Sequence, residues 1–583
     1  MSRKRRKKGP RSEERGAPPA VAPTSHARSR PGEREGEERE GEEREAEQTA
    51  RRPFDVVREN IEALVVAVVL ALIIRHFSVE AFEIPTGSMA TTLNGIHAWL
   101  ECPNCDCEFN VALQSDSATG QLKVPYQLMR VYEGPCPVPG APTAPHQVLR
   151  TGMAEFSLGG SEYALKSFPI QSDLVRSTRA IHRAARCPEC NYHYTAIIEE
   201  GNRYGGHKIL VTKFAYQVSD PARWDVIVFS FDQWKNYIKR LIGLPGERID
   251  IWDGDIYVNG SIERKAEHAY IQEVLWHKIS DSDRPKRDLP GSSPAWVELA
   301  EAKGGRDQAK GKFVEWDSNT QRWSVNTGDE LAVLDYQHPF DDYTAYNLIN
   351  HGIGQRGVHI VGDKKVAFTV RPIELQGAQG ATDGWLGAEI RDRDHSFQVR
   401  IPVGPATEGR EAVIARLTHD EGTLPNPNRS AHPDGQRVST PLTLPFGQPV
   451  RIEFENVDDR VALRIDSEEK LVLNYSSIPA DTSPSDITPP SSSSEHSLRL
   501  LFAKTQGMLE SVQVYRDIYY IDTIRHFGGI QLGPDEYLAL GDNSASSSDG
   551  RYWGSVPGKS LMGKAFVVIW PLWPTNFQGK RIR

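Results

Sequence analysis

Residues 61–93 read IEALVVAVVLALIIRHFSVEAFEIPTGSMATTL and hold the two features that decide the architecture. The run from Ala63 to Ile74 is apolar on every face and shows no amphipathic stripe, which favours a membrane helix over a helix packed in a core. This run is shorter than the roughly 20 residues that cross a bilayer comfortably. Because no small-x-small cleavage site follows it, we expect an uncleaved transmembrane anchor over residues 53–78.

The charges around this segment predict its orientation. Arg51, Arg52 and Arg58 lie before it, so the positive-inside tendency predicts a cytoplasmic N-terminus, a single pass through the cell membrane and an extracytoplasmic remainder in contact with the lipid bilayer. Residues 1–52 carry almost no apolar side chains and are expected to form a disordered charged cytoplasmic tail. The net charge of -9 argues against nucleic acid as a partner.

Directly after the anchor, a strand-like stretch broken by proline and glycine leads to Ser88. A serine becomes a nucleophile when a base removes its proton, but no G-x-S-x-G motif surrounds Ser88, and nothing selects one of the 17 histidines. A lysine can serve instead if an apolar site lowers its pKa. In residues 237–243, YIKRLIG, strand alternation puts Lys239 on one face with Tyr237 and Leu241. On its own, such a lysine is more often a solvated edge residue.

Four motifs that follow one another in a fixed order make a specific family resemblance recognisable. They are IPTGSMATTL at 84–93, RWDVIVF at 223–229, YIKRLIGLPGE at 237–247 and LGDNSASSSDGRYWG at 540–554. Together they resemble the bacterial type I signal peptidases. The resemblance extends to residues 206–216, 255–260 and 563–571 and implies a mainly β catalytic core built from residues 79–95, 206–262 and 517–583.

The resemblance also implies the roles of individual residues. Ser88 would attack the scissile carbonyl, Lys239 would act as its general base, the Ser547 hydroxyl would orient the lysine amine, and Thr86 would help to hold the oxyanion. Preprotein signal peptides would be the substrates, cut after Ala-x-Ala sequences, and catalysis would need no cofactor. The family positions that bind the substrate side chains correspond to Ile84, Pro85, Met89, Leu93, Tyr237 and Ile238.

Behind the expected active site the resemblance assigns structural support to four residues: Asp542, Asn543, Asp549 and Arg551. Ser544-Ala545-Ser546 stands where relatives have Arg-Asp-Asn. This departure leaves open what braces the loop from Asp542 to Arg551.

The insert over residues 96–205 carries two similar Cys-x-x-Cys motifs. Their four cysteines predict a structural zinc ribbon, with a pair of disulfides as the alternative in an oxidising compartment. The candidate ligands are Cys102, Cys105, Cys187 and Cys190. Cys107 and Cys136 remain outside either arrangement.

The larger insert, residues 263–516, shows strict alternation of apolar and polar side chains in 450–455 and 461–466. With further strand candidates at 366–370, 396–401, 412–417, 471–475, 498–502 and 512–515, it predicts a two-sheet sandwich similar to laminin-G or concanavalin-like domains. Such a sandwich could hold a carbohydrate or a protein ligand, or act as a spacer.

Two other interpretations stay open. The chain could be an inactive relative that acts as a membrane-anchored binding protein through its sandwich. It could also be a self-cleaving Ser–Lys regulator of the repressor type, although it has an anchor and lacks a helix-turn-helix pattern.

Overall fold

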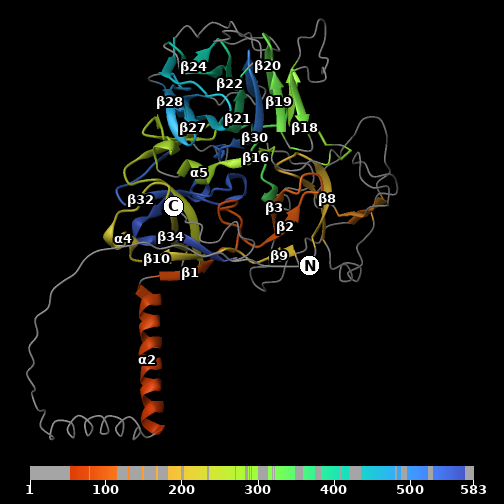
Figure 1. Cartoon of the computed structure of the whole chain (residues 1–583). Coiled ribbons are helices and arrows are strands. Elements are labelled where there is room, and N and C mark those ends of the chain that lie inside the picture. The colour runs from red at the N-terminus through yellow and green to blue at the C-terminus, as the bar shows by residue number, and fades with distance from the viewer. Residues whose placement is uncertain are drawn as a thin grey trace, which may run out of the picture. The chain divides into compact units, whose positions relative to one another are not determined.

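The structure is a computed structural model built mainly of β strands, which confirms the mainly β part of the predicted fold class (Figure 1). It describes residues 53–77, 79–113, 181–198, 202–232, 235–268, 271–282, 292–299, 313–317, 322–347, 359–374, 383–405, 409–418, 435–479, 496–522 and 529–570, with a few shorter stretches between them. The predicted tail over residues 1–52 lies outside these ranges.

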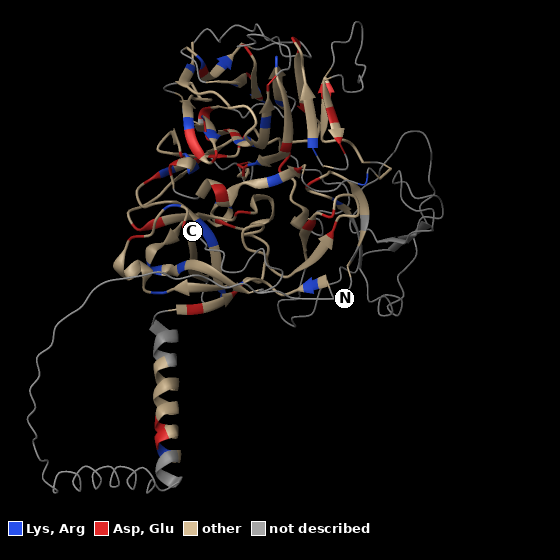
Figure 2. Ribbon diagram, viewed as in Figure 1, with Lys and Arg blue, Asp and Glu red and all other residues tan. Residues whose placement is uncertain are grey.

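The chain divides into two units, residues 1–75 and 76–583. The first contains nearly all of helix α2 (Pro53–Phe77), which has 25 residues. Its described side chains, from Val57 to Leu70, are exposed, and beyond Glu62 none of them is charged (Figure 2). Among the residues that the structure describes, no helix is both long enough and apolar enough to cross a membrane.

The second unit contains a seven-stranded antiparallel sheet in the order β1-β10-β34-β11-β12-β32-β33. Its strands come from three separate parts of the sequence, because β1 precedes the first insert and β32 to β34 follow the second. The bounds are β1 (Val79–Glu83), β10 (Lys208–Thr212), β11 (Val226–Asp232), β12 (Lys235–Gly243), β32 (Glu536–Leu540), β33 (Val556–Pro557) and β34 (Leu561–Trp570).

A second, four-stranded sheet in the order β15-β14-β13-β31 continues the same core. It is formed by β13 (Arg248–Trp252), β14 (Asp255–Val258), β15 (Ser261–Ile262) and β31 (Ile530–Gln531). Short helical elements complete this part: α4 (Ala215–Val218), η2 (Lys265–Glu267), α5 (Ile271–Leu275), η5 (Ser544–Ser546), α7 (Gly550–Trp553) and η6 (Gly558–Ser560).

The large insert forms two antiparallel sheets whose apolar faces share one core. The eight-stranded sheet contains β16 (His277–Asp281), β18 (Val314–Asp317), β19 (Arg322–Asn326), β21 (Lys364–Ile373), β26 (Val450–Val457), β27 (Arg460–Ile465), β28 (Glu468–Asn474) and β30 (Gln506–Arg516). The seven-stranded sheet contains β17 (Trp296–Leu299), β20 (Leu331–Tyr336), β22 (Trp385–Asp392), β23 (His395–Pro402), β24 (Glu411–Leu417), β25 (Arg437–Pro441) and β29 (His496–Ala503). Elements η3 (Ala345–Asn347) and η4 (Pro484–Asp486) lie in its connections.

The six further strand candidates in this insert fall within β21, β23, β24, β28, β29 and β30, apart from one residue past the end of β28, but the strands are longer, by six residues at the start of β30. The two alternating segments lie in β26 and β27, apart from one residue past the end of β27. The apolar residues predicted to face inward along β26 and β27 are buried. The outward face differs from the prediction, because Ala462 and Glu455 are buried as well. Glu455 accepts a 2.6 Å hydrogen bond from Arg464 and so keeps a partner inside the fold.

The smaller insert contains two hairpins that each turn at a Cys-x-x-Cys motif. One joins β2 (His97–Glu101) to β3 (Glu108–Ala112), with β9 (Arg203–Tyr204) at its edge, and the other joins β7 (Ile181–Arg186) to β8 (His193–Ile198). A small sheet of β4 (Met129–Val131), β5 (Gln147–Leu149) and β6 (Lys166–Ser167) lies between them in sequence. Since β2 begins four residues after Leu93, the first hairpin is a direct continuation of the Ser88 loop.

Candidate active site

Ser88 and Lys239 meet although 151 residues separate them in the sequence. Lys239 lies in the middle of β12, and Ser88 lies in the loop that follows β1. The lysine Nζ donates a 2.6 Å hydrogen bond to the Ser88 Oγ and a 3.2 Å hydrogen bond to the Ile238 carbonyl. This contact is the geometry that proton transfer between the two side chains requires.

The surroundings of Lys239 favour its neutral form. The side chain is buried, with 4% of the residue exposed. Burial lowers the pKa of Lys239 to about 8, against the opposing attraction of Asp549 and Asp542. At neutral pH a much larger fraction of this amine is therefore neutral, and able to accept a proton, than for a lysine of ordinary pKa.

The backbone around Ser88 is held from two sides. On one side Ile84 donates its N–H to the His207 carbonyl at 2.8 Å, next to the pairing of β1 with β10. On the other side Asn543 donates its N–H to the Ser88 carbonyl at 3.0 Å. Gly541 allows this approach, since a Cβ there would lie 2.4 Å from the Ser88 carbonyl oxygen.

Ser547 also lies beside Gly541 and the Ser88 carbonyl. A Cβ on Gly541 would come within 2.2 Å of the Ser547 Oγ, so this hydroxyl and the Ser88 carbonyl border one glycine. Ser547 is buried, and its Oγ has no hydrogen-bond partner among the described residues. Thr86, the other hydroxyl expected to assist, is exposed.

Four of the six expected substrate-contacting residues come together. Ile84, Met89 and Leu93 are buried in one apolar cluster, and Ile238 packs against it. Tyr237 belongs to a different cluster and stacks on Phe229, because neighbouring residues of β12 point to opposite faces of the sheet. Pro85 is exposed.

Two buried ion pairs lie behind the nucleophile. Arg240, next to Lys239 on β12, donates two hydrogen bonds of 2.7 and 2.6 Å to Asp542, and both side chains are fully buried. Arg551 pairs with Asp549 at 2.8 Å, also without exposure. The Asp549 carboxylate in addition accepts the Gly541 N–H at 2.9 Å and so fixes the turn beside Ser88.

The loop from Asp542 to Arg551 is braced by Ser544, which belongs to the segment that departs from the family pattern. The Ser544 hydroxyl accepts hydrogen bonds from the Arg551 guanidinium at 2.5 Å and from the Ile521 N–H at 2.8 Å. The Ser544 carbonyl accepts a further bond from Arg551 at 2.8 Å. A small hydroxyl side chain therefore joins the Arg551 guanidinium to the backbone of Ile521.

Two residues of the large insert also reach this site, and sequence reasoning missed them. The Asn347 side chain exchanges two 2.7 Å hydrogen bonds with the Asn543 side chain. The ring of Tyr346 covers Gly87, where a Cβ would lie 2.1 Å from the Tyr346 Cε1 atom. No motif marks either residue, because they belong to a short 3₁₀ turn far from the family segments.

The four cysteines of the Cys-x-x-Cys motifs also come together, as a buried cluster separate from the Ser88 loop. Cys107 is not part of the cluster and donates its thiol to Glu189 at 3.3 Å. Cys136 lies outside the described residues.

Comparison with known proteins gives the context for this site. A family model described as "Signal peptidase, peptidase S26" matches residues 201–319 and 495–570. The chain is 37% identical over 67 residues to Signal peptidase I of Bacillus caldolyticus, which covers 12% of this chain and 35% of the relative. It is 33% identical to Signal peptidase I V of Bacillus subtilis over 88 residues, and this alignment covers 15% of this chain and 52% of the relative.

A third relative, Probable signal peptidase I-2 of Synechocystis, is 48% identical over 46 residues, 8% of this chain and 21% of the relative. The chain thus spans between a fifth and about half of the length of these relatives. Among solved structures, the VIP36 exoplasmic/lumenal domain in its Ca2+/Man-bound form aligns with 40% of this chain and 86% of its own, at a TM-score of 0.26 and 8% identity. A TM-score this low supports no argument about fold or ligand.

Proposed function

We propose that the chain, whose residues 201–319 and 495–570 match the signal peptidase S26 family model, is a serine endopeptidase that removes signal peptides from exported preproteins. The observation that carries the proposal is the 2.6 Å contact between the Lys239 Nζ and the Ser88 Oγ, combined with burial of the lysine. A weak nucleophile and a base of lowered pKa are thereby within hydrogen-bond reach of each other.

In the proposed mechanism the neutral Lys239 amine takes the Ser88 proton as the Oγ attacks the scissile carbonyl. The resulting ammonium then gives that proton to the leaving amine, and a serine ester remains on the enzyme. Water attacks this ester in the second step, with Lys239 again as the base. Ser547, buried beside Ser88, is the proposed partner that orients the lysine amine. The Ser88 N–H and the Thr86 hydroxyl are the proposed donors to the oxyanion.

The apolar cluster supports a preference for small residues before the cut. Ile84, Met89 and Leu93 are buried and tightly packed, and Ile238 lies beside Lys239 on the same strand. Because these side chains are buried against one another, a substrate in extended form beside them would have little space for its own side chains, which suits alanine better than larger residues. We therefore propose cleavage after Ala-x-Ala sequences.

We also propose that α2 anchors the protein in the cell membrane, with the N-terminus in the cytoplasm. The sequence supports this through the apolar run from Ala63 to Ile74. Large apolar side chains of this helix are exposed: Val57, Ile61, Leu64, Val65, Val66, Val68, Val69 and Leu70. A lipid environment would remove this apolar surface from water.

Cleavage of a preprotein with one Ala-x-Ala site tests the function. The full chain, purified in detergent, is expected to release the mature protein with its new N-terminus directly after the second alanine. Ser88→Ala should release none within the same time, because the nucleophile is gone. Ser261→Ala, at an exposed serine of β15, is the matched control and should cleave like the wild type. Mass spectrometry of the products identifies the bond that is cut.

Two results would contradict the proposal. If folded wild type leaves several such preproteins intact, the chain is an inactive relative and binding through the sandwich becomes the leading hypothesis. If Ser88→Ala cleaves as fast as wild type, another nucleophile or a contaminating peptidase is responsible.

A further inference from the structure

The two Cys-x-x-Cys turns adopt the same conformation although their sequences are far apart. In the first, Cys102 donates its N–H to the Cys107 carbonyl and Asp106 donates to the Cys102 carbonyl, both at 2.9 Å. In the second, the equivalent bonds run from Cys187 to Tyr192 at 2.9 Å and from Asn191 to Cys187 at 3.1 Å. The residue after each motif, Asp106 or Asn191, has a positive φ of 52° or 56°. Two independent segments therefore present their cysteine pairs in the same way.

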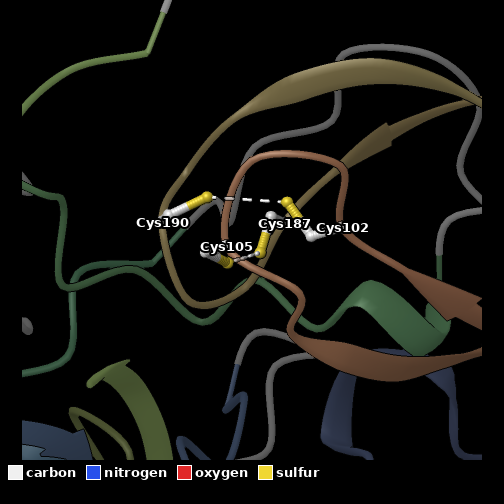
Figure 3. Close-up of side chains that lie close together, drawn as sticks. All are labelled: Cys102, Cys105, Cys187 and Cys190. Carbon is white, nitrogen blue, oxygen red and sulfur yellow. Dashed lines mark hydrogen bonds between the residues drawn. The ribbon is translucent and has the colours of Figure 1, made fainter. Parts of the chain in front are cut away.

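The four sulfur atoms of these turns converge on one point (Figure 3). All of them lie within 4.8 Å of one another. The Sγ atoms of Cys102 and Cys190 are 3.7 Å apart, and so are those of Cys105 and Cys187. Four thiolates at about 2.3 Å from a tetrahedral Zn²⁺ would be separated by about 3.8 Å. The spacing of the sulfur atoms matches a tetrahedral metal site.

The surroundings favour thiolates over a disulfide pair. Each short sulfur contact joins one turn to the other, whereas a disulfide would need the two atoms about 2.05 Å apart. The five cysteines of the described residues are free. The Glu189 N–H points to the Cys187 sulfur at 3.4 Å, and the Asn104 amide points to the Cys190 sulfur at 3.6 Å. Donors of this kind stabilise the negative charge of metal-bound sulfur.

We propose that Cys102, Cys105, Cys187 and Cys190 bind one Zn²⁺ in a closed structural site. Four soft sulfur ligands in a tetrahedron select zinc or iron among the common metals, and four protein ligands leave no position open for a substrate. The ion would join hairpin β2–β3 to hairpin β7–β8 across more than 80 residues of chain. It would thereby hold β2, the strand that directly follows the Ser88 loop.

Metal analysis of the full chain tests this site. Wild type purified in detergent without added metal should contain about one zinc ion per chain, as measured by inductively coupled plasma mass spectrometry. Cys187→Ser should lose most of it, and Cys107→Ser, a buried cysteine outside the cluster, should keep it. Because Cys187→Ser could fail to fold, a mercurial titration of wild type is the second measurement, with one zinc released per chain as its thiols are blocked.

Three results would overturn the proposal. Iron in place of zinc would assign the site to another metal. Wild type without metal, with all its thiols titratable, would mean that the cluster is a packing feature. A mass lower by the four hydrogens lost in two disulfides would restore the alternative that the sequence left open.

A different set of contacts carries a second inference, about residues 341–347 of the large insert. The first end of this segment is fixed to Arg186 at the end of β7, in the hairpin that carries the second Cys-x-x-Cys motif. Arg186, directly before Cys187, pairs with Asp341 through two hydrogen bonds of 2.9 and 3.0 Å. Tyr343 donates its hydroxyl to the Arg186 carbonyl at 2.9 Å, and the guanidinium lies 4.0 Å from the centre of its ring.

The other end of the 341–347 segment is fixed to the nucleophile loop. Tyr346 packs with Ala90 and Ala112 and covers Gly87. Asn347 is buried and holds the Asn543 side chain through two hydrogen bonds. Asn543 in turn donates its side-chain amide to the Gly87 carbonyl at 2.9 Å and its N–H to the Ser88 carbonyl at 3.0 Å.

We infer that Asn347 is a positioning residue for Ser88 in the proposed peptidase reaction. Asn347 contacts neither the Ser88 Oγ nor the Lys239 Nζ. It acts through Asn543, because its two hydrogen bonds hold both the nitrogen and the oxygen of the Asn543 side-chain amide. A nucleophile that is displaced by about 1 Å loses on the order of 100-fold in rate. The large insert is then required for catalysis at the core and is more than an attached domain.

The inference rests on the proposed function, and the test separates the two. Asn347→Leu keeps the volume but removes both hydrogen bonds, so kcat for preprotein cleavage should fall about 10- to 100-fold. KM should change less than about twofold, since the substrate-facing cluster is untouched. The control is Asn474→Ala, at an exposed position at the end of β28, which should match wild type.

The outcomes are distinct. If wild type cleaves and Asn347→Leu cleaves with the same kcat, the positioning role is wrong while the function stands. If KM rises and kcat holds, Asn347 serves substrate binding, which also contradicts the inference. If wild type itself is silent, it is the proposed function that fails.

Discussion

Replacement of Lys239 by methionine is expected to lower kcat at least about 1000-fold, the largest loss of any change outside Ser88. Methionine fills a volume close to that of lysine in this buried position but cannot accept a proton. The Ser88 hydroxyl then has no base within hydrogen-bond reach among the described side chains. Initial rates of preprotein cleavage at saturating substrate measure the effect.

Lys235→Met is the matched control. Lys235 lies on the same strand, β12, but is exposed, so its loss removes a similar side chain without touching the site. It should change kcat by less than about twofold. Equal losses in Lys235→Met and Lys239→Met would mean that the assay responds to the charge or stability of the strand, and Lys239 would lose its role as base.

The same lysine predicts the pH dependence of the wild type. Since only the neutral amine accepts a proton and burial lowers the pKa of Lys239 to about 8, kcat/KM should rise with pH and reach half of its limit near pH 8. A base with the ordinary lysine pKa would instead give a rise centred above pH 10. A pH profile that is flat from pH 6 to pH 10 would contradict the assignment.

The sequence predicts which residues belong to this candidate site better than it predicts where their side chains point. Ser88, Lys239 and Ser547 are found through motifs, because each needs a specific functional group in a specific local sequence. The motifs carry less information about side-chain direction. Tyr237 and Ile238 are neighbours in one motif, yet the alternation of β12 sends Tyr237 to another cluster.

Contacts that come from the inserts lie beyond such reasoning. Tyr346 and Asn347 reach the Ser88 loop only because the chain between them and β30 folds as a sandwich that returns to the core. Long-range packing of this kind has no local signature in composition or periodicity. The buried Glu455 on β26 has the same origin, since its partner Arg464 on β27 becomes visible only when the strands are paired.

The ion pair of Arg240 and Asp542 gives the second large prediction, for stability. Asp542→Asn leaves the guanidinium of Arg240 fully buried without its counter-charge, which costs about 3–5 kcal/mol for pairs of this kind. The unfolding midpoint of the catalytic core should fall by roughly 10 °C in differential scanning calorimetry of the full chain. Asp535→Asn, an exposed aspartate just before β32, is the control and should shift the midpoint by less than about 2 °C.

The same substitution should also alter the chemistry, which separates its effect from general destabilisation. The charge of Asp542 raises the pKa of Lys239, so its removal lowers that pKa further. The activity that remains at low temperature should therefore reach half of its limit below pH 8. The double variant Arg240→Met with Asp542→Leu should recover part of the stability, because no charge is then left buried. If Asp542→Asn keeps both the midpoint and the pH profile of wild type, the pair neither stabilises the core nor contributes to the field at the lysine.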